Sequence, residues 1–251
     1  MKLPRLATNL FTQEQMVEGV DIPPWLVSEY DVFRKVVLDP SFPCYFGAIG
    51  ERNGELRYTY TDENAWEDLP NTLRDFLILS RDYPETRHAL ALFVKPAPKP
   101  HSLEKYQAQF WEILNYLHEH DPTPWPTQLP SDPESPLWEF CFDGEPMFIF
   151  SSTPAYTKRI SRHLGDSLVL LFQPRRVFNG IEGGTIAGTR AREIIRQKMV
   201  HLEGMPAHPD MGSYGDPSTH EWKQYFLPDD NTPVTGKCPF HMNTHELKKG
   251  E

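Results

Sequence analysis

The chain has 251 residues, of which 39% are hydrophobic and 24% charged, proportions that are ordinary for a soluble globular protein. Its formal net charge of −10 argues against a broad nucleic-acid-binding face, because phosphate binding needs clustered lysine and arginine. Three cysteines are too few for a disulfide scaffold, and no apolar run predicts a signal peptide or a membrane helix. We therefore expect a cytoplasmic protein in a reducing setting.

The first part of the chain predicts a helical lead-in followed by a hairpin. Residues 1–40 carry apolar side chains at roughly helical spacing. Residues 45–50 and 56–61 then flank Asn53-Gly54, and Asn-Gly between two β-rich runs favours a hairpin. Cys44 would therefore stand at the entrance to a strand.

The rest of the chain predicts three longer helices and several strands. The helices are expected over residues 64–81, 103–118 and 185–202, and the strands over residues 88–94, 137–142, 146–151 and 167–173. Ser102 is expected to cap the second of these helices. Asp143-Gly144 favours a second hairpin. The inward face of the last helix is expected to carry Ile186, Ala191, Ile194, Ile195, Met199 and Leu202.

This order of elements predicts an α+β fold with a mostly antiparallel or mixed sheet, built from hairpins and covered by about three main helices. We expect a single domain over residues 1–251, in which residues 241–251 form a flexible tail.

The three cysteines favour different roles. Cys141 lies between two phenylalanines in a predicted strand, which favours a small buried side chain. Cys44 and Cys238 each adjoin a proline at the edge of an element, where neighbouring N–H groups can stabilise a thiolate. A thiolate can act as a nucleophile or as a metal ligand.

Two further patterns leave alternatives open. Arg159, Arg162, Arg175 and Arg176 form a cationic set that can anchor carboxylate or phosphate groups, or can make ordinary salt bridges with the acidic residues. Cys238, His241 and His245 have spacing that can hold zinc, with Cys44 as a fourth ligand, or can be incidental residues of a polar tail.

Several short pieces of sequence, taken together and in order, carry a family resemblance. They are Phe42-Pro43-Cys44, Trp125-Pro126, Trp138-Glu139-Phe140, Ser161-Arg162, Phe172-Gln173-Pro174-Arg175, Tyr214-Gly215, Glu221-Trp222-Lys223-Gln224-Tyr225 and Cys238-Pro239-Phe240. On these pieces the chain resembles the YqcI/YcgG family of bacterial proteins across nearly its whole length. One branch is similar to haem-dependent enzymes that hydroxylate guanidine or amine nitrogens of arginine and related small molecules.

The resemblance implies haem b, an oxygenase that uses O₂ or peroxide, a small guanidino or amino substrate, and a redox partner. Cys44 and Cys238 are then the candidate iron ligands, and we prefer Cys44 because an anchored loop fixes a ligand better than a tail does. In a third alternative, the two thiols face each other. His208 is a reserve axial ligand.

Five further residues complete the implied site. Arg159, Arg162 and Arg175 would suit haem propionates or a substrate carboxylate, and Gln224 and Tyr225 would supply hydrogen bonds in the pocket. Two other hypotheses stay open: a haem-binding or haem-sensing protein without turnover, and a zinc-stabilised or purely structural module.

Overall fold

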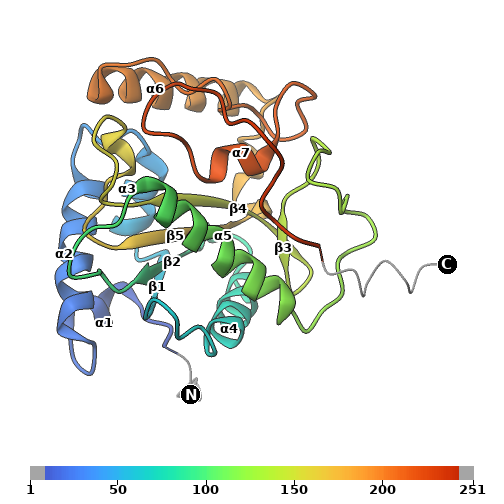
Figure 1. Ribbon diagram of the computed structural model, residues 1–251. Coiled ribbons are helices and arrows are strands. Elements are labelled where there is room, and N and C mark those ends of the chain that lie inside the picture. The colour runs from blue at the N-terminus through green and yellow to red at the C-terminus, as the bar shows by residue number, and fades with distance from the viewer. Residues whose placement is uncertain (1–8, 243–251) are drawn as a thin grey trace.

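The computed structural model describes residues 9–242, and a five-stranded sheet lies at the centre of this part of the chain (Figure 1). Its strands are β1 (Leu56–Thr61), β2 (Ala89–Val94), β3 (Phe140–Phe142), β4 (Glu145–Ser152) and β5 (Leu168–Pro174), in the order β1-β2-β5-β4-β3. β1 and β2 pair in parallel, and the other neighbours pair antiparallel. The predicted α+β class with a mixed sheet is confirmed.

Helices cover both faces of the sheet. They are α1 (Gln13–Glu18), α2 (Pro24–Leu38), α3 (Tyr45–Arg52), α4 (Leu69–Asp82), α5 (Leu103–Glu119), α6 (Ile186–Glu203) and α7 (Glu221–Tyr225), with the 3-10 helices η1 (Ile160–Arg162) and η2 (Arg175–Phe178). The lead-in predicted before residue 40 forms α1 and α2, and the three predicted longer helices correspond to α4, α5 and α6. The prediction of one domain over residues 1–251 stays a prediction.

Strand β2 shows how the two layers of helices are joined through the sheet. All of its residues are buried, and alternate side chains point to opposite faces. Leu90, Leu92 and Val94 pack with α4, α5 and α7, on what we call the α5 side. Ala89, Ala91 and Phe93 pack with α1 and α2, on what we call the α2 side. A fully apolar strand is therefore required here, since neither face meets solvent.

The predicted hairpin over residues 45–61 is wrong, because residues 45–52 form the helix α3. Asn53-Gly54 ends that helix: the N–H of Gly54 bonds Glu51 O at 3.3 Å, and the N–H of Glu55 bonds Gly50 O at 2.9 Å. Gly54 has φ of 66°, the left-handed conformation that closes a Schellman cap. The glycine that suggested a tight hairpin turn therefore caps a helix, and β1 pairs with β2 through α4 instead.

The second predicted hairpin is confirmed. β3 and β4 pair around Asp143 and Gly144, whose φ values of 50° and 73° are those of a hairpin turn with both central residues left-handed. Ser102 also caps α5 as predicted, since its hydroxyl accepts the N–H of Lys105 at 3.4 Å.

Two details of the predicted helices are wrong. α4 begins at Leu69 and not at Asn64, because Asp62 and Ala65 pair in a short bridge before it. α6 buries Ala191 and Met199 but leaves Ile186 90% exposed and Ile194 37% exposed. This helix lies along one rim of the molecule, at the top of Figure 1, so only a narrow stripe of it meets the body.

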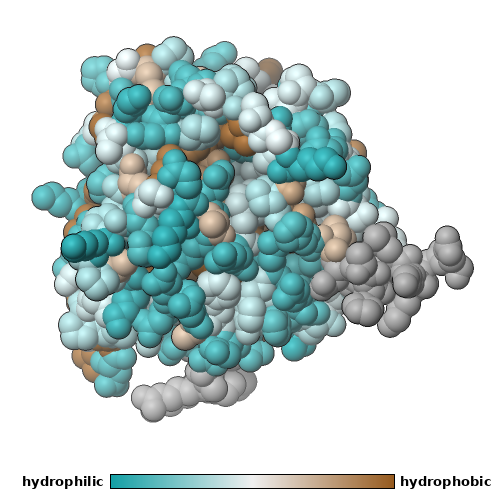
Figure 2. Space-filling view, in the orientation of Figure 1, coloured by the Kyte–Doolittle hydropathy of each residue, from teal (hydrophilic) through white to brown (hydrophobic). Residues whose placement is uncertain are grey.

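No helix within residues 9–242 is both long and apolar enough to span a membrane. The face seen in Figure 2 is mainly hydrophilic, with apolar atoms in small patches. All but the first two residues of the predicted tail over residues 241–251 lie outside the described residues.

Candidate functional site

Cys44 lies immediately before α3, half-buried on the α2 side of the sheet. Burial raises the pKa of its thiol, while the N–H groups of Gly47 and Phe46, which donate to the sulfur, and the charge of Lys198 act in the opposite direction. The start of a helix thus surrounds this sulfur with groups that favour a thiolate.

Lys198, on α6, holds in place the loop that carries Cys44. The Lys198 ammonium group donates to the main-chain carbonyls of Pro40 and Phe42, at 3.0 and 3.2 Å. The loop is therefore fixed by a residue more than 150 positions away in the sequence, and not by a strand as predicted.

Cys238 lies on the other side of the sheet, packed against the α5-side core. Burial raises the pKa of its thiol to about 12, with Phe240 N–H acting against the shift and the carboxylate of Glu134 adding to it. Cys238 has one N–H donor where Cys44 has two, and an anion nearby where Cys44 has a cation. Burial thus favours the neutral form of both thiols, and Cys44 differs in having a cation nearby.

The sheet separates the two thiols, so Cys44 and Cys238 do not face each other and do not meet at one metal ion. Within residues 9–242, no group of three or more metal-ligating side chains comes together, and His245 lies outside that range. Cys141 is buried as predicted.

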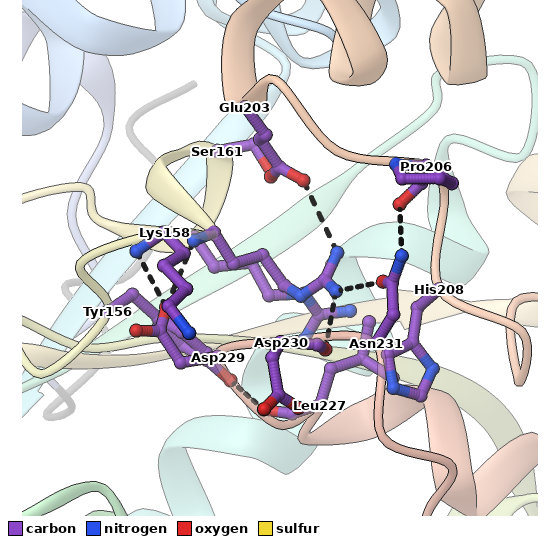
Figure 3. A network of polar contacts seen from close by, with 12 residues as sticks. Tyr156, Lys158, Ser161, Glu203, Pro206, His208, Leu227, Asp229, Asp230 and Asn231 are labelled. Carbon is purple, nitrogen blue, oxygen red and sulfur yellow. Dashed lines mark hydrogen bonds and ion pairs between the residues drawn. The ribbon is translucent and has the colours of Figure 1, made fainter.

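Arg159 is a fully buried residue, and its partners Glu203, Asp230 and Asn231 are labelled in Figure 3. It donates to the carbonyls of Pro228 and Asp230 at 3.0 and 2.8 Å and to the side chain of Asn231 at 2.9 Å. It also forms an ion pair with Glu203, at the end of α6, at 3.3 Å. These contacts make Arg159 a brace between η1, α6 and the segment after α7.

The carboxylate of Asp229 supports the same network. It accepts the N–H groups of Thr157, Lys158 and Arg159, at 2.9 to 3.2 Å. Burial alone would raise the pKa of Asp229, but hydrogen bonds from Arg159 and its neighbours hold it below the ordinary value. The network is therefore built around an ionised carboxylate.

Arg162 is also buried and held by the main chain. It donates to the carbonyls of Gln224 and Tyr225 at 2.8 and 3.0 Å and to the hydroxyl of Ser151 at 3.2 Å. Its guanidinium lies over the ring of Phe150, 4.4 Å from the centroid. Arg162 thus ties α7 to β4.

The side chains of Tyr225 and His208 also have structural partners. The Tyr225 hydroxyl accepts Phe140 N–H at 3.1 Å and donates to Met147 O at 3.0 Å, which links β3 and β4. Both ring nitrogens of His208 lie near main-chain groups, Thr232 O at 3.0 Å and Asp210 N at 3.2 Å.

Arg175, by contrast, lies among acidic and aromatic groups where the surface begins. Its Nε donates to Glu139 at 2.7 Å, and its terminal Nη2 donates to Glu221 at 2.5 Å. The rings of Tyr214 and Phe178 lie 4.2 and 5.3 Å from the guanidinium carbon. Its side chain is 24% exposed. We call Glu139, Arg175, Tyr214 and Glu221 the carboxylate–arginine cluster.

The cluster contains two carboxylates for one cation. Burial raises the pKa of Glu139 to about 7, although Arg175 acts to lower it and Glu221 adds to the increase. Burial also raises the pKa of Glu221, again against Arg175. The cluster therefore can take up or release a proton near neutral pH, a property that is frequent at functional sites.

Aromatic side chains from distant parts of the chain gather beside the cluster. The Trp138 ring lies 5.3 Å from Phe240, 6.2 Å from Tyr225 and 6.3 Å from Trp125, measured between ring centroids. These rings all belong to pieces that carry the family resemblance. The structure thus brings most of those pieces to one place, the α5 side beside β3 and α7, while Cys44 lies elsewhere.

Glu139 and Glu221 were missed as candidate site residues, although both lie within the resemblance pieces. Each is the lone carboxylate beside aromatic residues, in Trp138-Glu139-Phe140 and Glu221-Trp222. A charged residue inside an otherwise aromatic, buried piece is the signal that could have found them, because such a charge needs a partner.

One hollow among the described residues lies beside His101 and Tyr106, and another lies beside Thr59 and Thr72. Neither of these two is lined by a cysteine.

Comparison with known proteins establishes the family. The model of the YqcI/YcgG family matches residues 33–241, and the chain belongs to this family. It is 36% identical to the Bacillus subtilis protein YcgG over 88% of this chain and 89% of that protein. It is 34% identical to a Streptomyces lavendulae protein named "Putative N(omega)-hydroxy-L-arginine synthase DcsA", over 92% of this chain and 89% of the relative. No solved structure matches the chain.

Proposed function

We propose that this protein is a cytoplasmic enzyme that hydroxylates a nitrogen of a small guanidino or amino compound. The observation that carries the proposal is the similarity, over nearly the whole of both chains, to the relative named as a hydroxyarginine synthase. The guanidinium of Arg175, enclosed by carboxylates and rings, is an example within this chain of how such a group is held.

The proposed cofactor is haem b, with the sulfur of Cys44 as the iron ligand. The N–H groups of Phe46 and Gly47 and the charge of Lys198 support this role, because they act against the rise in the pKa of the thiol that burial causes. A thiolate-bound haem supplies activation of O₂ or peroxide by favouring O–O cleavage.

The overall reaction determines which further reactants are needed. One oxygen atom enters an N–H bond to give N–OH, and the other leaves as water. With peroxide no further reductant is required, whereas with O₂ two electrons and two protons must be delivered, so we propose a redox partner for that route.

The test is to express the chain with a haem supply and to incubate it with L-arginine, using peroxide in one arm and O₂ with a reductant in the other. We expect a Soret band in the absorption spectrum and, by mass spectrometry, a product one oxygen atom heavier than arginine. Substrate analogues with amino groups then define the substrate class.

Two matched variants test the ligand. Cys44→Ser is expected to abolish or shift the Fe(II)–CO band, while Cys238→Ser, on the other side of the sheet, should keep it. If the spectra of both variants are the same as that of the wild type, neither of these thiolates is the iron ligand. Haem binding without any product would overturn the enzyme proposal, and bound zinc without iron would overturn the haem proposal.

A further inference from the structure

Helix α6 buries little apolar surface for its length. Of its 18 residues only Gly188, Ala191 and Met199 are buried, whereas α5, with 17 residues, buries eight. The helix lies along one rim of the molecule, and half of its residues are exposed (Figure 1). Segments with few buried apolar contacts open at a lower free energy than the core does. We therefore expect α6 to separate from the body more readily than α5.

Polar side chains of α6 supply much of its attachment by donating to main-chain carbonyls of neighbouring segments. Lys198 donates to the carbonyls of Pro40 and Phe42 at 3.0 and 3.2 Å. Arg196 donates to the carbonyl of Met211 at 2.8 Å. When such a contact opens, its donor and acceptor can bond water instead, so each one stabilises the closed arrangement only modestly.

The two ends of α6 differ in how they are held. At its C-terminal end, the fully buried carboxylate of Glu203 pairs with Arg159 at 3.3 Å and accepts the hydroxyl of Ser161. Before the other end, Gly180 has φ of 82°, and nothing beyond the chain neighbours of Gly180 or Gly184 lies within 4 Å of where a β-carbon would be. Such glycines can absorb the backbone rotation of a hinge. The geometry thus allows α6 to turn about its Glu203 end.

The turn of α6 that carries Lys198 lies against the loop before Cys44. The charge of Lys198 acts to lower the pKa of the Cys44 thiol, so the ammonium group is near the sulfur. The Phe42 ring and the Cys44 sulfur adjoin the same spot, since each lies 3.8 Å from the place where a β-carbon on Gly47 would be. By holding the carbonyl of Phe42, Lys198 therefore also holds the ring that shields the sulfur.

We propose that α6 is a movable cover for Cys44 and that Lys198 is its latch. When Lys198 releases the carbonyls of Pro40 and Phe42, α6 turns about Glu203 and the loop is free to move away from the sulfur. The opening gives a flat ligand access to a side chain that the closed arrangement shields. That this ligand is haem rests on the proposed function, whereas the cover itself does not.

The experiment is to label the purified full chain with iodoacetamide under native conditions at one pH, and to follow each cysteine by mass spectrometry of its peptide. A thiol that is reached only through an opening reacts in proportion to the population of the open state. In the wild type, Cys44 is expected to react at least about tenfold more slowly than in the urea-unfolded chain. Lys198→Met should speed this reaction about tenfold, because it removes two hydrogen bonds from a charged donor.

Two variants and an internal reference separate the opening of α6 from a general loss of stability. Lys198→Arg keeps the charge and the donor groups, so Cys44 should react near the wild-type rate. Arg190→Met, on the exposed face of α6, should also leave that rate unchanged. Cys238, on the other side of the sheet, should react equally fast in Lys198→Met and in the wild type.

Three results would overturn the proposal. They are a wild-type Cys44 that reacts as fast as in the unfolded chain, a rate that Lys198→Met leaves unchanged, and a Cys238 that is accelerated by the same factor as Cys44. The labelling needs no haem, so its result is independent of the proposed function. A missing Soret band would overturn haem binding and leave the cover intact.

Discussion

Arg159 and Arg175 hold their guanidinium groups in opposite ways. Arg159 is fully buried, and three of its four acceptor groups are neutral carbonyl or amide oxygens. Arg175 is partly exposed, and both of its acceptors are carboxylates. The Arg159 guanidinium forms an ion pair with one carboxylate, Glu203, while the Arg175 guanidinium forms ion pairs with two, Glu139 and Glu221.

The two arginines therefore differ in role: Arg159 holds segments of the chain together, whereas Arg175 belongs to a cluster whose protonation depends on pH. Near Arg159 the pKa of Asp229 is lowered, so that carboxylate stabilises the fold above its unfolded pKa and loses this contribution in acid. Near Arg175 the pKa of Glu139 is raised, so its contribution is lost as the solution becomes more alkaline. Only the second centre changes its charge in the range where cells operate.

The largest effect is expected from Arg159→Met, which would leave Glu203 buried without its cation. Breaking a buried ion pair from one side costs roughly 3–5 kcal/mol, and we expect a loss of that size in the free energy of unfolding, measured with urea at pH 7. Arg190→Met, on the exposed part of α6, is the control and should change stability by less than about 0.5 kcal/mol. A loss below about 1 kcal/mol for Arg159→Met would show that Arg159 is not a brace.

Glu139→Gln should remove a pH dependence. The folded-state pKa of Glu139 is about 7, above its ordinary value of 4.5, so its contribution to stability is complete below about pH 4.5 and is lost as pH rises through 7. A shift of this size corresponds to a change on the order of 3 kcal/mol between those limits.

Urea unfolding at several pH values measures this slope. The wild type should lose stability relative to Glu139→Gln between about pH 4.5 and 7, and the two curves should run parallel outside that interval. Asp229→Asn is the matched comparison, because its difference from the wild type should instead shrink in acid. If the stability of the wild type and that of Glu139→Gln changed with pH in parallel over the whole range, Glu139 would have its ordinary pKa.

A feature could be predicted from the sequence when the residues that form it are close together along the chain. Ser102 and Asp143-Gly144 were predicted correctly because a cap and a tight turn depend on neighbouring residues. Asn53-Gly54 was misread because a left-handed glycine serves a hairpin and a Schellman cap equally well. Local sequence alone cannot separate those two uses.

The candidate site was less predictable for the same reason. Arg159 and Arg175 looked alike in sequence because their partners lie about 36 to 72 positions away, in segments whose packing no local pattern reveals. The choice of Cys44 and Cys238 as iron ligands rested on the resemblance and stays a prediction. The sheet between them, however, follows from pairings that the chain makes only on folding.

The smallest effect should come from the ring that covers Arg175. A cation–π contact at a partly exposed place contributes about 0.5–1 kcal/mol, so Tyr214→Leu should couple to Arg175→Met by that amount in a double-mutant cycle. Tyr214→Phe keeps the ring and loses only the hydroxyl that donates to Leu137 O at 2.9 Å, so its coupling to Arg175→Met should be near zero. If Tyr214→Leu and Tyr214→Phe had equal coupling energies to Arg175→Met, the hydroxyl of Tyr214, and not its ring, would be the group that interacts with Arg175.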